Sequence, residues 1–281
     1  MAVLRTAFFI IMNGVTVVNN QIKELRRNYS SIEIQERAIQ VGKRYTSSIN
    51  EARLLFLVNW LFGSKVNFKN DESFNVKEFI NELLIRYYPT ETIIKHAFIK
   101  FARKSGVYIF ELPIGNSRVD ICRINKFSHA FEIKTEYDVL NRLEKQIADY
   151  AEVFDYVSVV IASSLIAKVE EIIPRSCGIY VYEHMTGALG IHFVHVRKSL
   201  KNFNINSTTQ LQTLSKKTLD AILMQSKEKN SITDTDVVSN LKEHLSEQQI
   251  NYNFKKALTE KYFKKWNMDL KRLTTILPID F

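Results

Sequence analysis

The chain has 281 residues, enough for one large domain or two modest ones with an ample apolar core. Its composition, 46% hydrophobic and 25% charged, is that of an ordinary globular protein and excludes a disordered or fibrous one. The formal net charge of +9 favours an anionic partner, and nucleic acid is the commonest one. The two cysteines, Cys122 and Cys177, form no CxxC pair, which is typical of a reduced, cytoplasmic protein.

The first part of the chain, residues 1–86, is predicted to form a helical N-terminal region. An apolar stretch over residues 7–18 is too short to span a bilayer and precedes no small-residue cleavage site. We therefore expect a buried helix or strand there, and no membrane span. A polar loop is expected over 64–73. Apolar residues at helical spacing predict three helices, over residues 20–41, 48–62 and 75–86.

The middle of the chain, residues 87–200, is predicted to form an α/β core. Thr90 is placed to cap a helix over 91–104, and a second helix is expected over 139–153. Short β-rich runs predict strands over residues 107–112, 118–124, 130–135, 156–162, 178–182 and 190–196. This order of elements favours a central mixed β-sheet flanked by helices.

The last part of the chain, residues 201–281, is predicted to be helical and is net basic. Over 254–266 an apolar helical stripe alternates with a row of lysines. An ordinary amphipathic surface helix explains this pattern. The more specific alternative is a lysine row that faces nucleic acid. The candidate phosphate-binding residues of this row are Lys255, Lys256, Lys264 and Lys265.

Two carboxylates and one amine form the most informative pattern in the chain. Glu132 and Lys134 are two apart in a predicted strand, so they project from the same side of the sheet. Asp120 lies in the preceding strand, which a hairpin would place beside them. Their apolar neighbours in both strands would point the other way, into the core.

Phosphodiester hydrolysis gives such a cluster a chemical purpose. A metal ion offsets the charge of the phosphate and lowers the pKa of an attacking water. Mg²⁺ prefers oxygen ligands, and a nearby lysine can stabilise the developing charge. The alternative for an isolated Glu-x-Lys triplet is a surface ion pair on an amphipathic strand.

The next predicted helix carries polar residues on one stripe. Arg142, Gln146 and Tyr150 are spaced four residues apart, so they lie on one side of the helix. They can face the sheet edge and contact phosphate or a metal-bound water. A solvated helix face is the alternative.

The order Asp120, Glu132-x-Lys134, then Gln146 and Tyr150 on the following helix resembles the PD-(D/E)XK nuclease superfamily, specifically its RecB-type members. The stretch is similar to a bacterial and phage family of small, mostly uncharacterised proteins, and the MmcB-like DNA repair proteins are expected relatives. The resemblance covers about residues 88–182 and neither flank.

The resemblance implies a restriction endonuclease-like core and Mg²⁺-dependent phosphodiester cleavage, for which Mn²⁺ is expected to substitute. By the family pattern Asp120 and Glu132 would bind the metal and Lys134 would be catalytic. Gln146 and Tyr150 would act as accessory residues near the substrate.

A third acidic ligand is expected from one of two places. Glu91 stands at the start of the first core helix, where the superfamily often adds an acidic residue, although a carboxylate there also complements the helix dipole. Glu111 is the second candidate, because its predicted strand lies next to that of Asp120.

The sequence therefore predicts a metal-dependent nuclease in a repair, phage or defence setting, with DNA as the expected substrate and Arg118 and Arg142 among its contacts. One alternative is a catalytically silent nucleic-acid-binding protein with the same fold. Another is a phage-defence interaction protein whose helical flanks contact a protein partner. The pattern does not indicate an oligomeric state.

These hypotheses make geometric predictions. The side chains of Asp120, Glu132 and Lys134 should converge on one sheet face. Gln146 and Tyr150 should face the same place, with Arg142 at its mouth. The C-terminal lysine row should lie on the same side as Asp120.

Overall fold

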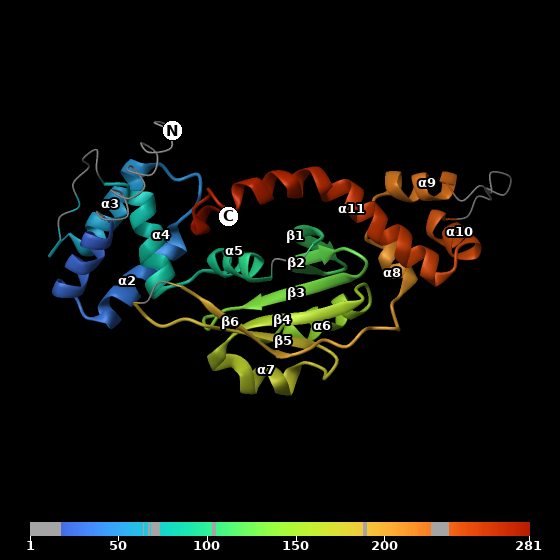
Figure 1. Cartoon of the computed structure of the whole chain (residues 1–281), viewed down its shortest axis with the longest axis horizontal. Coiled ribbons are helices and arrows are strands. Elements are labelled where there is room, and N and C mark those ends of the chain that lie inside the picture. The colour runs from blue at the N-terminus through green and yellow to red at the C-terminus, as the bar shows by residue number, and fades with distance from the viewer. Residues whose placement is uncertain are drawn as a thin grey trace. The chain divides into compact units, whose positions relative to one another are not determined.

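The computed structural model of the chain (Figure 1) describes residues 18–63, 65–66, 68, 74–102, 105–187, 190–225 and 236–281. The element expected over 7–18 and the loop expected over 64–73 lie almost entirely outside these ranges. Within them, no helix has both the length and the apolar character that crossing a bilayer requires.

The described residues divide into two compact units. The first contains the chain up to Lys100 together with residues 183–192 and 275–281, and the second contains residues 101–182 and 193–274. This division differs from the three regions expected from the sequence, because the C-terminal helices group with the β-sheet.

The first unit is built from helices around a continuous apolar core. A helical segment over residues 18–28 precedes them. The helices are α2 (Ser31–Arg44), α3 (Glu51–Phe62), α4 (Val76–Tyr87), α5 (Glu91–Ala102) and the short 3-10 helix η2 (Pro278–Asp280). Their core includes the fully buried side chains of Leu25, Leu54 and Phe79.

The single helix predicted over 20–41 is two helices in the structure. The break lies at Ser30, whose hydroxyl accepts from the Glu33 amide at 3.3 Å while the Glu33 carboxylate accepts from the Ser30 amide at 2.8 Å. This reciprocal capping starts a new helix inside a stretch of uninterrupted apolar periodicity. The prediction of one helix was wrong, because apolar periodicity alone does not reveal an N-cap within a helical stretch.

The second unit contains a mixed six-stranded sheet in the order β1-β2-β3-β4-β5-β6. The strands are β1 (Val107–Ile114), β2 (Ser117–Ile124), β3 (Ser128–Lys134), β4 (Tyr156–Ala162), β5 (Gly178–Glu183) and β6 (His192–Arg197). The first three pair antiparallel, and β3, β4 and β5 pair parallel. The predicted mixed sheet with flanking helices is confirmed, and each predicted strand overlaps an observed one.

Seven helices of this unit flank or follow the sheet in the described residues. They are α6 (Leu143–Ala151), the short 3-10 helix η1 (Ser163–Leu165), α7 (Ile166–Ile172), α8 (Ser207–Gln212), α9 (Lys216–Gln225), α10 (Val237–His244) and α11 (Glu247–Arg272). The helix predicted over 139–153 begins later, at Leu143. The preceding residues form turns, in which the Asp138 carboxylate accepts from the Thr135 amide at 2.6 Å.

Strand alternation gives the sheet two different faces. Asp120 and Glu132 project from one side, which we call the carboxylate face. Tyr108 and Phe131 project from the other side, which we call the aromatic face. The Arg123 guanidinium lies 5.8 Å from the centre of the Phe131 ring on this second face.

The long helix α11 packs against β1 through the aromatic face. The Trp266 ring lies 4.7 Å from that of Tyr108 and 6.3 Å from that of Phe110. The predicted apolar stripe is confirmed for Phe254, Leu258 and Trp266, which are buried. The predicted position of the lysine row, on the same side of the sheet as Asp120, was wrong, because the Trp266 contact holds α11 against the opposite face.

One lysine of the predicted row has a structural partner. Lys255 lies 3.2 Å from the carboxylate of Asp155, and the two side chains are 16% and 3% exposed. The same carboxylate accepts from the Ser128 amide at 2.7 Å and from the Asn251 side chain at 3.2 Å. Lys255 therefore joins α11 to the sheet and is not placed to bind phosphate, whereas Lys256, Lys264 and Lys265 are exposed.

Replacing Lys255 by Met should destabilise the fold. The change leaves the buried Asp155 carboxylate without its cation, and breaking such a pair costs about 3–5 kcal/mol. The loss should fall near the lower end, because Ser128 and Asn251 still donate to Asp155. Urea unfolding would measure it.

Lys256→Met is the matched control for this change. Its side chain is exposed, so the free energy of unfolding should change by no more than about 0.5 kcal/mol. Equal stability of the two variants would contradict a structural role for Lys255.

Candidate functional site

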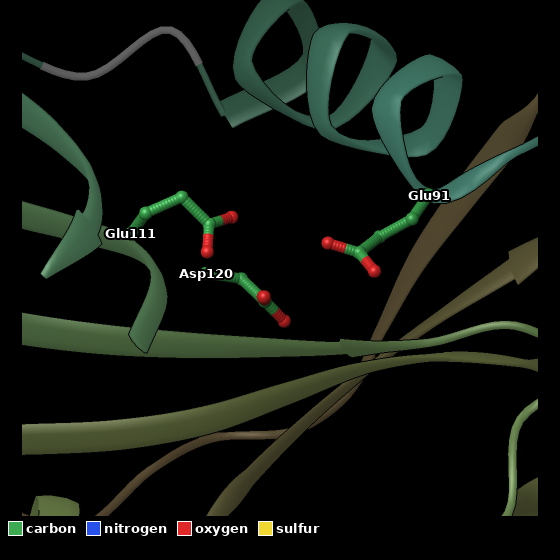
Figure 2. A group of neighbouring side chains, drawn as sticks. All are labelled: Glu91, Glu111 and Asp120. Carbon is green, nitrogen blue, oxygen red and sulfur yellow. The ribbon is translucent and has the colours of Figure 1, made fainter. Parts of the chain in front are cut away.

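Three carboxylates occupy a single row across β1, β2 and β3. The pairs Phe110–Ile121 and Leu112–Val119 place Glu111 opposite Asp120. The pair Ile121–Phe131 likewise places Asp120 beside Glu132 on the carboxylate face. Figure 2 shows the side chains of Glu111 and Asp120, whose carboxylate oxygens lie within 4.8 Å of each other.

The Glu132 carboxylate is buried and receives three donors. Lys134 Nζ lies 2.7 Å and Gln146 Nε2 lies 2.6 Å from Glu132 Oε1. The Tyr150 hydroxyl lies 2.7 Å from Glu132 Oε2 and 2.6 Å from the Arg118 carbonyl oxygen, so one proton serves two acceptors. Side chains from β3 and α6 thus hold Glu132 in one orientation.

Burial and neighbouring charges shift the pKa values of Glu132 and Tyr150. Burial raises the pKa of Glu132, while the Lys134 ammonium and the donors from Tyr150 and Gln146 act in the opposite direction. Burial also raises the pKa of Tyr150, and the negative charge of Glu132 raises it further. Tyr150 is therefore held as a protonated donor.

Asp120 takes the place of a backbone acceptor between β2 and β3. Its Oδ2 atom accepts from the Ile133 amide at 2.7 Å, just beyond the point where the paired residues of the two strands end. Asp120 is buried, with 8% of its surface exposed. The bond fixes one carboxylate oxygen against β3.

Glu111 has an unusual backbone. Its φ of 55° is the only positive value at a non-glycine residue in the described ranges. Such a conformation is uncommon for a residue with a Cβ and is found preferentially at functional sites. Its carboxylate is exposed and lies 3.8 Å from the Arg118 guanidinium.

The geometric prediction for the central residues is confirmed. Asp120, Glu132 and Lys134 share one face of the sheet, and Gln146 and Tyr150 reach Glu132 from α6. Hydrogen bonds thus join Lys134, Gln146 and Tyr150 to Glu132, and Asp120 shares their face of the sheet.

The remaining candidates lie at the periphery or in the other unit. Arg142 is exposed at the N-cap of α6 and makes no side-chain capping bond. The Arg118 side chain is 67% exposed. Glu91, also labelled in Figure 2, begins α5 in the first unit and forms an ion pair with Lys95, and its role as a metal ligand stays a prediction.

Sequence reasoning missed two supports of this site. The Ser117 hydroxyl donates to Asp149 on α6, which ties the start of β2 to the helix. The Arg118 main-chain carbonyl lies within hydrogen-bond distance of the Tyr150 hydroxyl. The first could have been suspected because Asp149 directly precedes Tyr150, but a main-chain acceptor leaves no signal in the sequence.

Comparison with known proteins identifies a family. A family model described as bacteriophage P4 protein cII matches residues 86–280. The chain belongs to the phage P4 cII family. Protein cII of Enterobacteria phage P4 is 28% identical over 142 residues, which are 48% of this chain and 53% of the relative. The aligned part thus spans about half the length of that curated relative.

Among solved structures, a protein of unknown function from Silicibacter pomeroyi is similar to this chain. It is 15% identical, and the match covers 50% of this chain and 94% of the other, with a TM-score of 0.31. A likeness at this level carries no argument about fold or function. The family match includes the sheet and the C-terminal helices, which form one unit in the structure.

Tyr150→Phe should lower the stability of the protein. The change leaves Glu132 Oε2 and the Arg118 carbonyl without their donor, and an unsatisfied buried acceptor costs about 1–3 kcal/mol. Chemical denaturation monitored by circular dichroism would measure the loss.

Tyr252→Phe supplies the control for this change. That tyrosine is 65% exposed, so removal of its hydroxyl should alter the free energy of unfolding by no more than about 0.5 kcal/mol. Wild-type stability in Tyr150→Phe would show that Glu132 does not depend on this donor.

Proposed function

We propose that this member of the cII family is a metal-dependent nuclease of the PD-(D/E)XK type that hydrolyses phosphodiester bonds, with DNA as its substrate. The observation that carries the proposal is that Asp120, Glu132 and Lys134 share one sheet face, where Lys134 pairs with Glu132. Gln146 and Tyr150 support it, because they hold the Glu132 carboxylate from α6.

The donor set fits Mg²⁺, or Mn²⁺, which takes the same kind of oxygen ligand. Glu132 accepts three bonds, and a carboxylate offers about four acceptor positions, so one remains for an ion. The carboxylate oxygens of Glu111 and Asp120 lie within 4.8 Å of each other, so both residues could contribute oxygen ligands to one ion. Asp120 and Glu132 would hold the ion, with Glu111 as a further ligand.

When bound, the ion would supply charge neutralisation at the phosphate and a lowered pKa for an attacking water. Lys134, with 14% of its side chain exposed, is held beside Glu132, where its amine can donate to a phosphate oxygen as negative charge develops. Gln146 Oε1 is buried and has no partner among the described residues, so it is an acceptor that a water in the site can satisfy. Asp120 and Glu132 would thus bind the metal, Lys134 would stabilise the developing charge and Gln146 would orient a water.

The arrangement argues against a silent nucleic-acid-binding protein. Glu111, Asp120 and Glu132 place three carboxylates in one row. Without a cation these groups repel a phosphate, and a pure binding protein has no need of them. The proposed contacts to nucleic acid are the exposed residues Arg118, Arg142, Lys256, Lys264 and Lys265. Lys255 is not among them, because it pairs with Asp155.

Lys134→Ala should reduce metal-dependent cleavage by about 10²–10³-fold, because removing one donor to the developing charge costs that much. Asp120→Asn should reduce it by weakening the metal site. Plasmid DNA, single-stranded DNA and RNA would be incubated with Mg²⁺, with Mn²⁺ and with EDTA, and the products resolved on gels.

Lys145→Ala is the matched control on the neighbouring helix. Lys145 is 61% exposed and pairs with Asp149 at 2.8 Å, so its loss should leave the cleavage rate nearly unchanged. Unaltered cleavage by Lys134→Ala would contradict its catalytic role. A wild-type protein that cleaves none of the substrates with either ion would favour the silent binding protein.

A further inference from the structure

The outer side of α3 presents two large aromatic rings to solvent. Phe56 is 73% exposed and Trp60 is 62% exposed. They are four residues apart, so they lie on the same side of the helix, about 6 Å apart along its axis. The opposite side of α3 is buried through Leu54, Val58 and Phe62. The helix is therefore apolar on both sides, although only one contributes to the core.

Two arginines flank these rings. The Arg44 guanidinium lies 5.7 Å from the centre of the Trp60 ring. It also donates to the Gln40 carbonyl at 3.1 Å, which orients it. Arg53 lies one turn before Phe56 on the same side of α3. Both arginines are exposed, and no carboxylate in the described part of the chain lies within ion-pair distance of either.

Exposed rings beside exposed arginines favour a nucleic-acid partner over an apolar protein surface. An apolar protein surface would cover the rings but would bury or confront the two positive charges, which is costly without counter-ions. A single strand of nucleic acid offers both complements, since its bases stack on aromatic rings and its phosphates pair with arginines.

We propose that the surface formed by Arg44, Arg53, Phe56 and Trp60 binds single-stranded DNA, with bases stacked on the two rings and phosphates at the two arginines. The stacking surface lies outside the carboxylate site and does not depend on the proposed nuclease. The choice of DNA over RNA rests on that proposed function. The surface would hold a strand without reading its sequence, because every base has a face that can stack.

Tryptophan fluorescence offers a direct test. The chain has two tryptophans, and Trp266 is buried with 6% of its surface exposed. Quenching by an added strand would therefore report on Trp60, and a Trp266→Phe variant would confirm the source of the signal. The full chain would be titrated with oligo(dT) in EDTA, which prevents metal-dependent cleavage, and the anisotropy of a labelled strand would give Kd.

The proposal predicts quenching of Trp60 and a weaker Kd in variants that lose a ring. Trp60→Ala and Phe56→Ala should each raise Kd by about 5- to 150-fold, the range for loss of one stacked base. Trp60→Phe keeps an aromatic face and should lose less. Arg44→Gln should reduce the salt dependence by about 0.7 in the log–log slope, as expected for one phosphate contact on a single strand.

Ile32→Ala is the matched control, because Ile32 is an exposed apolar residue on α2, 70% exposed, and should leave Kd unchanged. Unquenched Trp60 emission, or equal Kd values for Trp60→Ala and wild type, would overturn the proposal. Tighter binding of oligo(U) than oligo(dT) would overturn the assignment to DNA. Self-association that Trp60→Ala abolishes would instead assign the surface to a second copy of the chain. Because the titrations contain EDTA, their failure is distinguishable from failure of the nuclease.

Discussion

The candidate site depends on one buried charge, the carboxylate of Glu132. A carboxylate with 2% of its surface exposed is costly unless donors surround it. Here the donors come from β3 and from α6, so the charge requires the helix to lie against the carboxylate face. The position of α6 and the ionic character of Glu132 therefore depend on each other.

The same constraint explains the local irregularities of the sheet. Asp120 accepts from the Ile133 amide where the paired residues of β2 and β3 end, so the strands can diverge without an unsatisfied amide. Glu111 adopts a positive φ opposite Asp120. Such strain persists only where surrounding structure compensates for it. Both irregularities lie at carboxylates of the proposed cation site, Asp120 and Glu111.

Much of the second unit could be predicted, because its information is local. Strand alternation alone placed Glu132 and Lys134 on one face, and helical spacing alone aligned Gln146 with Tyr150. The polar partners of the C-terminal helix were not predictable in this way. Lys255 and Asp155 are a hundred residues apart, and the pattern around Lys255 is the same for a phosphate-binding lysine as for a structural one. The sheet face that receives Trp266 is likewise fixed by tertiary contacts with Tyr108 and Phe110.

Anomalous diffraction from a crystal soaked in Mn²⁺ would test the central claim most directly. We expect a manganese peak on the carboxylate face, within about 2.5 Å of oxygens from both Asp120 and Glu132. Lys134 should remain beside it, and Glu132→Gln should abolish the peak. A soaked crystal with no manganese at Asp120 and Glu132, and with the Lys134–Glu132 ion pair unchanged, would contradict a metal site on this face. The buried carboxylate would then be a structural charge rather than part of a metal site.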